Sequence, residues 1–243
     1  MAAAAFAAGI QNALAGGGSF LTFPALLMTG LDPQGANITS TIALFPAQVS
    51  TGIPGRREAT GTPSLSFTAL FVISLIGGGL GALLLLETPS DIFTAMVPWL
   101  VLFATIVFAW GSFFRKVNDN SKPLGSYAAG TLQFCISIYG GYFGGGIGIL
   151  MLAALTLSGL KLKNAGATKN VLAGVMNSSA VLIFIFLHDV AWKQALVVAI
   201  AATAGGQVGA YALPRVNERA MRICIVLLGL ALTMGLLLHY HTG

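Results

Sequence analysis

The sequence predicts an all-α polytopic membrane protein with two inverted-topology repeats, each a re-entrant (broken) helix hairpin plus three transmembrane helices. Three observations lead to this prediction. Apolar residues make up 56% of the 243 residues and charged residues only 8%, against roughly 25% charged residues in a soluble domain. A triple glycine interrupts an apolar run in each half of the chain, at 16–18 and at 144–146. The basic residues gather in short loops, which is typical of membrane topology rather than of nucleic-acid binding.

The elements of the two halves follow the same order. The first repeat is predicted over 1–114, with a hairpin over 2–29 and helices over 38–53, 65–86 and 92–114. A cytoplasmic linker over 115–125 follows. The second repeat is predicted over 126–243, with a hairpin over 126–159 and helices over 167–187, 193–212 and 220–239. The opening residues MAAAAFAAG lack the positive start of a signal peptide and are expected to begin a mature element.

The repeat extends to single positions. Gly17 corresponds to Gly145, and after one inserted residue Thr39 corresponds to Thr168 and Gln48 to Asn177. Later glycines also correspond, since Gly77 and Gly81 match Gly205 and Gly209 with the same spacing of four. Small residues four apart let helices approach closely in lipid, so we expect these four glycines to serve helix packing.

The segment 126–159 is predicted to turn back rather than cross the membrane. As one helix its 34 residues would be about 51 Å long, whereas the hydrocarbon core is about 30 Å thick. If the segment turns back, Lys161 lies on the same side as Lys122 and the other basic loops, as the positive-inside rule requires. Each half then crosses the membrane three times, which inverts the second half. Inverted repeats with broken helices are typical of secondary transporters.

The hairpin tips are the first candidate site. Glycine breaks a helix and leaves room for close approach to the backbone, and a helix N-terminus offers unpaired N–H groups that bind anions. Ser19 is expected to cap the second arm of its hairpin. The alternative is that the glycines only permit tight crossing and that the N–H groups are capped internally. The candidate residues at the two tips are Gly17, Gly18, Ser19, Gly145, Gly146 and Ile147.

Two polar helices are expected to line the same cavity. Gln48 and Asn177 carry amides, which need several hydrogen-bond partners in lipid. The hydroxyl groups have an alternative role, because serine and threonine also bond within a helix bundle. Lys169 lies near a helix start, where it either extends to the cytoplasm or attracts anions at an inner entrance. The candidates on these helices are Thr39, Ser40, Thr41, Gln48, Thr168, Lys169, Asn170, Asn177 and Ser178.

The titratable residues argue against other functions. All seven carboxylates and all three histidines lie in or beside loops or at helix ends, whereas proton relays and sodium sites use groups inside the membrane. No nucleophile–base pair or metal-ligand cluster is visible, so we predict no enzyme activity, no cofactor and no metal. Cys135 and Cys224 lie apart in apolar segments and are expected to be buried.

A family resemblance adds to this interpretation. The string GIQNALAGGGSFLTFPALLMTGLDPQGANITST resembles the opening motif of the TauE/SafE family of membrane anion exporters, and GYFGGGIGILMLAALTLSGLKLKNAGATKN resembles its second copy. One departure is that Pro24 follows the first glycines, whereas Leu152 stands at the matching place. The resemblance implies export of sulfite and organosulfonates such as sulfoacetate, with a site at Gly17, Gly18, Ser19, Gly145, Gly146 and Ile147.

The leading hypothesis is therefore a secondary transporter, predicted to export small sulfur-containing anions from a multi-pass position in the plasma (bacterial inner) membrane. The expected partners are a small anion such as sulfite or sulfoacetate and the lipid bilayer, with no nucleic acid, and a homo-oligomer is compatible with this interpretation. The alternatives are a transporter of another small solute and a non-transporting membrane scaffold.

Overall fold

The computed structural model describes residues 1–14, 17–53, 56–114, 123–212 and 218–242, and these form helices joined by short loops. Gly16 and residues 115–122 of the predicted linker lie outside the described residues. The α-helices are α1 (Ala2–Leu14), α2 (Ser19–Leu27), α3 (Pro33–Gly52), α4 (Phe67–Glu87), α5 (Ser90–Ala109), α6 (Ser126–Tyr142), α7 (Ile147–Leu157), α8 (Leu162–Leu187), α9 (Trp192–Ala212) and α10 (Glu218–Thr242). A 3₁₀ turn (η1, Arg56–Glu58) precedes α4, and a π-helical turn (η2, Trp110–Phe114) ends α5.

Helix α3 begins earlier than predicted because of a local cap. The Asp32 side chain accepts a hydrogen bond from the Gly35 N–H at 3.2 Å, and Pro33 occupies the first turn. Both features favour a helix start at this point. The segment before position 38, predicted as a loop, is therefore helical. Helix α8 likewise begins at Leu162, five residues before the predicted start at 167.

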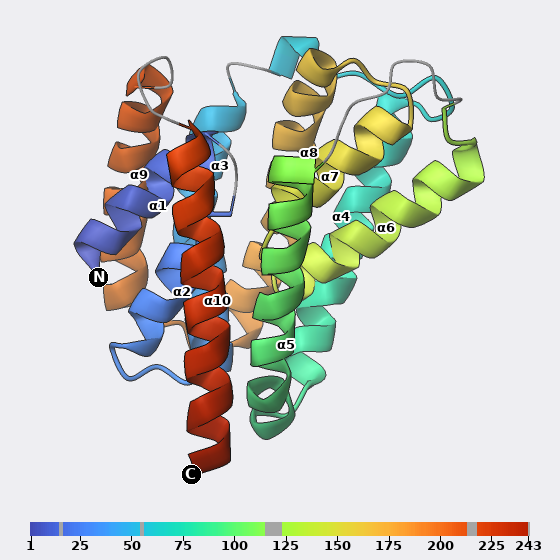
Figure 1. Ribbon diagram of the computed structural model, residues 1–243. Helices are drawn as coiled ribbons and strands as arrows, with labels where there is room; N and C mark the ends of the chain where they lie inside the picture. The colour runs from blue at the N-terminus through green and yellow to red at the C-terminus, as the bar shows by residue number, and fades with distance from the viewer. Residues whose placement is uncertain (15–16, 54–55, 115–122, 213–217, 243) are drawn as a thin grey trace.

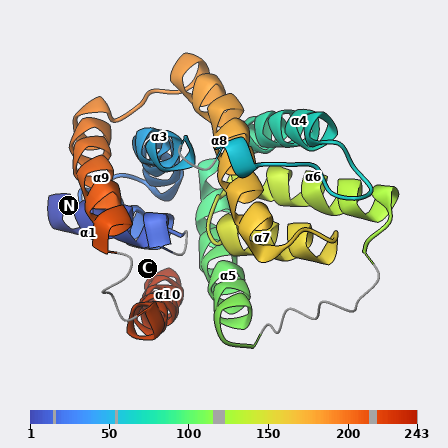
Figure 2. The ribbon, with the colours of Figure 1, turned by 90° about the horizontal axis from the view of Figure 1, so that it is seen from above.

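The helices pack in couples that repeat between the halves (Figures 1 and 2). Helix α1 packs on α9 and α6 packs on α4, while α3 packs on α9 and α8 packs on α4. The short helices follow the same pattern, since α2 contacts α1 and α3, and α7 contacts α6 and α8. Two further contacts, α3 with α8 and α5 with α10, join helices that occupy the same place in the order of the two halves. The fourth long or short helix of each half, α4 or α9, thus packs against the first and third helices of the other half.

Glycines allow these couples to approach closely. A Cβ atom at Gly81 would overlap the Ile138 carbonyl oxygen of α6, and one at Gly77 would lie 2.6 Å from the Ser137 Cβ. On the other side of the molecule, a Cβ atom at Gly205 would overlap the Phe6 carbonyl oxygen of α1. The packing role expected for these three glycines is therefore confirmed.

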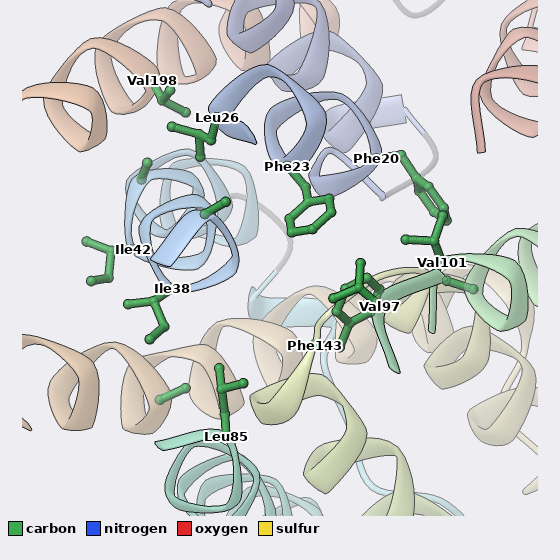
Figure 3. Close-up of a cluster of buried hydrophobic side chains, with 14 of the residues drawn as sticks. Phe20, Phe23, Leu26, Ile38, Ile42, Leu85, Val97, Val101, Phe143 and Val198 are labelled. Atoms are coloured by element: carbon green, nitrogen blue, oxygen red, sulfur yellow. The ribbon is translucent and has the colours of Figure 1, made fainter. Parts of the chain in front are cut away.

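The core lies where the short helices meet the long ones. Phe20, Phe23 and Leu26 of α2 pack with residues of α3, α5 and the end of α6 (Figure 3). Phe23 and Phe143 meet edge to face, with ring centroids 6.0 Å apart. Since Phe143 directly follows α6, this contact joins the turn regions of the two halves.

The outer surface is apolar, as expected for contact with lipid. Exposed side chains along α5 and into η2 recur every three or four residues, and these are Met96, Trp99, Phe103, Ile106 and Trp110. Among the described residues, α4, α5 and α8 are long and apolar enough to cross a membrane, and α7 and residues 222–238 form shorter apolar helices. Cys135 and Cys224 are exposed. The prediction that they are buried is wrong, because an apolar membrane helix presents such residues to lipid as readily as to the core.

One end of the bundle carries the basic loops. Lys163 forms an ion pair with Glu58 at 2.9 Å, and the Asn164 side chain donates to the Glu58 carbonyl. Thr60 and Thr168 exchange two hydrogen bonds of 3.0 and 3.1 Å beside them. These contacts bring η1 against the start of α8, at the top of Figure 1. Arg56, Arg57 and Lys161 belong to the same end.

The opposite end carries acidic loops. The Gln34 side chain donates to the Leu85 carbonyl at 2.7 Å and accepts from the Ser90 hydroxyl at 2.7 Å. These bonds tie the start of α3 to the turn between α4 and α5, at the bottom of Figure 1. Glu87 and Asp91 flank this turn. Charge is therefore segregated between the two ends of the bundle.

Candidate functional site

A cavity of about 60 Å³ lies between the two short helices and the polar faces of α3 and α8. One water molecule needs roughly 10–15 Å³ of such space, so the cavity has room for a small oxyanion. Both halves of the chain contribute to its wall. The lining residues are Asn12, Gly17, Gly18, Ser19, Ser40, Thr41, Leu44, Gln48, Phe143, Gly144, Ile147, Gly148, Lys169, Asn170, Ala173 and Asn177.

The start of α2 presents free backbone donors to this cavity. Among the described residues, none accepts a hydrogen bond from the N–H groups of Gly17, Gly18 or Ser19. The Gln11 side chain donates to the Gly17 carbonyl at 2.8 Å, which fixes the turn before the helix. Ser19 is the first helical residue and Gly18 takes the capping position without a side-chain bond. The prediction that Ser19 caps this helix is therefore wrong, and its N–H remains available.

The start of α7 repeats this arrangement. Gly146 precedes the helix with a φ of +73°, and no side chain caps it. Within the described residues, the N–H groups of Ile147 and Gly148 also lack an acceptor. Glycine adopts a positive φ at no steric cost. The N–H groups at both tips thus have no acceptor among the described residues, and two positive helix ends adjoin one cavity. Tight crossing also applies at the first tip, because an added Cβ at Gly18 would lie 2.9 Å from the Ala8 carbonyl oxygen.

Two polar stripes complete the wall. Thr41 and Gln48 on α3 occupy the positions that correspond to Asn170 and Asn177 on α8. The Asn177 side chain donates to the Gln48 side-chain oxygen at 2.6 Å. Gln48 and Asn177 occupy corresponding positions in the two repeats, so this bond connects two equivalent positions of the two halves.

Lys169 is the basic side chain of the cavity wall. It is half-buried, and in the part of the chain that the structure describes no carboxylate lies within ion-pair distance of its ammonium group. The ion pair of the same helix uses Lys163 instead, outside the cavity. A cation without a counter-ion beside free N–H donors makes this cavity suited to an anion.

The structure brings together most, but not all, of the predicted site residues. Ten line the cavity, namely Gly17, Gly18, Ser19, Ser40, Thr41, Gln48, Ile147, Lys169, Asn170 and Asn177. Five do not. Thr39 is buried in the bundle, Thr168 bonds Thr60, Ser178 donates to the Val175 carbonyl, Gly146 precedes α7, and Gly145 lines a smaller cavity.

Sequence reasoning missed several lining residues. Asn12 lies on α1, where the adjacent amides of Gln11 and Asn12 before the glycines were the available signal. Gly144 and Gly148 belong to the second glycine-rich turn and flank the predicted site residues Gly145, Gly146 and Ile147. Phe143 gave no signal, since an aromatic residue beside a helix break is interpreted as core.

A second cavity, of about 10 Å³, adjoins the first. Ser19 and Phe143 line both cavities. Its remaining wall is mostly apolar, and Asn37 provides an amide there. The other residues that line this smaller cavity are Phe20, Phe23, Val101, Gly145 and Leu232.

Comparisons with known proteins find a matching family and several relatives. The family model described as sulfite exporter TauE/SafE matches residues 1–236. A Sinorhizobium protein named "Probable membrane transporter protein ORF9" is 31% identical over 237 residues, covering 96% of this chain and 90% of that protein. A Haemophilus influenzae "Probable membrane transporter protein" is 30% identical, covering 94% and 89%. The Escherichia coli "Probable membrane transporter protein YfcA" is 28% identical, covering 98% and 88%.

Proposed function

The chain belongs to the sulfite exporter TauE/SafE family, and from that premise we propose that it is a secondary transporter that exports small sulfur-containing anions such as sulfite or organosulfonates. The family and the relatives indicate a multi-pass membrane transporter rather than an enzyme. The substrate class and the direction are our proposal. The observation that carries it is the cavity in which Lys169 and the free N–H groups of two helix ends meet.

This combination favours an oxyanion over a cation or a neutral solute. Backbone N–H groups at a helix N-terminus donate to anionic oxygens without a competing counter-charge. Lys169 adds a positive charge. The Asn170 and Asn177 amides add N–H groups that can donate hydrogen bonds to the oxygens of a solute. A sulfite or sulfonate group presents three oxygens, which matches donors arriving from several sides.

The two halves are proposed to be inverted repeats, each a re-entrant hairpin and three crossings. The exchanged packing couples support a pseudo-twofold relation between them. The bond between Gln48 and Asn177 supports it further, because counterparts contact each other only beside such an axis. The Leu124 N–H donates to the Leu157 carbonyl at 3.1 Å, so the segment from α6 to α7 returns to its starting end. The positive-inside rule places the end with Lys161 in the cytoplasm.

This topology predicts the labelling of two introduced cysteines. In a Cys135→Ser, Cys224→Ser background, Lys161→Cys is expected to react with an impermeant thiol reagent from the cytoplasmic face only. Glu87→Cys, at the acidic end, is expected to react from the outer face only. Labelling in oriented vesicles measures both. Reaction of position 161 solely from outside would overturn the hairpin and the inverted symmetry.

The substrate proposal predicts a specific loss on removal of the cavity cation. Lys169→Gln is expected to weaken binding of sulfite and sulfoacetate roughly 10- to 150-fold, or about 1.5–3 kcal/mol, the typical contribution of a hydrogen bond to a charged group. Titration calorimetry of purified protein with sulfite, sulfoacetate, sulfate, thiosulfate and taurine measures this loss and the order of preference.

The matched control is Lys163→Gln, which removes a cation from the same helix outside the cavity. It is expected to leave anion binding within about twofold, because its partner is the exposed Glu58 and surface ion pairs contribute little. Equal losses in both variants would indicate a general charge effect. Binding of none of the five compounds, four anions and the zwitterion taurine, by the parent protein would refute the proposed substrate class.

A further inference from the structure

We propose that Phe143 is the gate that separates the anion cavity from the face of the membrane opposite Lys161, and that Asn37 holds this gate closed. The inference rests on the proposed transport function and assigns the barrier of the transport path, which the family and the cavity alone do not locate. The first observation is position. Phe143 lines both cavities, as Ser19 does, and its ring contacts Phe23, which lines the smaller one.

The ring of Phe143 is held on several sides. It is 6% exposed and meets Phe23 edge to face at 6.0 Å, with Tyr139 at 6.3 Å. A Cβ atom at Gly145 would lie only 2.8 Å from the Phe143 Cε1 atom. Gly145 therefore makes room for this ring, a role different from the anion contact predicted for it.

The backbone at Phe143 is suited to movement. The residue follows the last turn of α6 with φ −130° and ψ −41°, outside helical geometry. Gly144 and Gly146 come next, with φ of +79° and +73°. Residues that absorb large backbone changes lie at such element ends. A rotation in this short link would withdraw the ring from between the cavities.

Asn37 fastens this link to α3. Its side chain donates to the Tyr142 carbonyl at 3.0 Å, one residue before Phe143, and it also lines the second cavity. Its counterpart in the repeat is Gly166, where an added Cβ would meet nothing within 4 Å. Gly166 lies on the α8 stripe that continues through Asn170 to Asn177. The hydrogen bond between Asn37 and Tyr142, near the acidic end, therefore has no equivalent at Gly166, near the Lys161 end.

The two cavities thus form one interrupted path. The larger cavity adjoins α8 from Lys169 to Asn177, around the middle of the helix, and reaches Gln48 in the part of α3 that lies toward the basic end. The smaller cavity adjoins Asn37, near the start of α3 at the acidic end. An anion that leaves the larger cavity through the smaller one would pass Phe143. An aromatic ring blocks an anion by size and by its apolar character, and it does so without a charge that would trap the substrate.

The test measures from which face a cysteine in the larger cavity can be reached. The reporter is Ala173→Cys in the Cys135→Ser, Cys224→Ser background, in oriented vesicles, and the probe is an impermeant methanethiosulfonate that carries a sulfonate. The parent is expected to react from the Lys161 face. Phe143→Ala is expected to raise the rate from the opposite face by about tenfold, in line with the loss of aromatic contacts. Asn37→Ala is expected to raise it in the same direction.

The matched control is Phe93→Ala, which removes a buried ring that meets Tyr142 at 5.7 Å but lines neither cavity. Retained labelling from the Lys161 face verifies that each variant is folded. If the opposite-face rate stays at the parent value in both Phe143→Ala and Asn37→Ala, or if Phe93→Ala raises it equally, the gate is refuted. Protection of the reporter cysteine by sulfoacetate is a separate readout. Its absence in every protein would refute the proposed anion function and leave the gate to be judged by the labelling rates.

Discussion

Gly17→Leu is expected to reduce anion binding roughly 100-fold or more, or about 2.7 kcal/mol. Gly17 lines the cavity, and its backbone has a φ of +88°, which leucine adopts only under strain. A Cβ atom there would lie 3.2 Å from Phe20 and 3.3 Å from the Gln11 nitrogen that bonds the Gly17 carbonyl. The larger side chain would therefore displace Phe20 and Gln11 and disturb the turn that positions the N–H donors beside the cavity.

Gly30 provides a matched control for the backbone strain. It has the same φ of +88°, lies outside the cavity and has nothing within 4 Å of an added Cβ. Gly30→Leu therefore introduces a similar backbone cost without filling the site, and its binding is expected to stay within about twofold of the parent, as for a position far from the ligand. Sulfoacetate binding by calorimetry and thermal unfolding measure the two effects separately. Parent-like affinity in Gly17→Leu would place the site elsewhere.

Transport of a permanently ionised monovalent sulfonate is expected to follow the membrane potential alone. One elementary charge gains about 2.3 kcal/mol per 100 mV, which corresponds to a concentration ratio of about 50-fold. In a cell that is negative inside, this term drives an anion outward. The described carboxylates lie at helix ends or in loops, and these are Asp32, Glu58, Glu87, Asp91 and Asp189. Besides Lys169, the polar groups of the cavity are amides, hydroxyls and backbone N–H groups, which do not titrate near neutral pH.

Purified protein in liposomes tests this expectation, with the potential set by potassium and valinomycin. Reversal of the imposed potential should reverse net flux, and imposed sodium or pH gradients at zero potential should produce none. Lys169→Gln serves as the site-specific control, because its flux should fall at every potential. Flux that ignores the potential and follows the pH gradient would contradict the prediction and indicate a proton carried with the substrate.

The sequence predicted the parts of the site that depend on residue type and spacing. Glycine breaks and amides at corresponding positions of two apolar halves indicated the helix ends and the Gln48–Asn177 region, and the structure places them around one cavity. The lining of the cavity differs from the predicted set where a rotation along a helix decides which residues face it. Thr39 and Ser178 each lie one position from a lining residue, and the turn of about 100° per residue directs them away.

Other features depend on the three-dimensional arrangement alone. Phe143 lines two cavities only because the turn after α6 meets α2 of the other half, and no local pattern indicates this. The early start of α3 at Pro33 was available from the Asp32 cap, but the following polar residues were interpreted as a loop. Both cysteines are exposed because a surface that faces lipid is apolar. Hydropathy alone does not distinguish an apolar residue on that surface from one in the core.

The contact between Gln48 and Asn177 has a consequence for the energetics of alternating access. Under the proposed pseudo-symmetry, a transition that exchanges the conformations of the two halves maps this contact onto itself, so its free energy cancels between the two states. The Asn37 bond to Tyr142 maps onto Gly166, which has no side chain to donate, so its free energy does not cancel. The equilibrium of the empty protein is thereby biased toward the conformation with the Asn37 bond. A substrate must bind the opposite conformation more tightly by at least that difference in order to populate it.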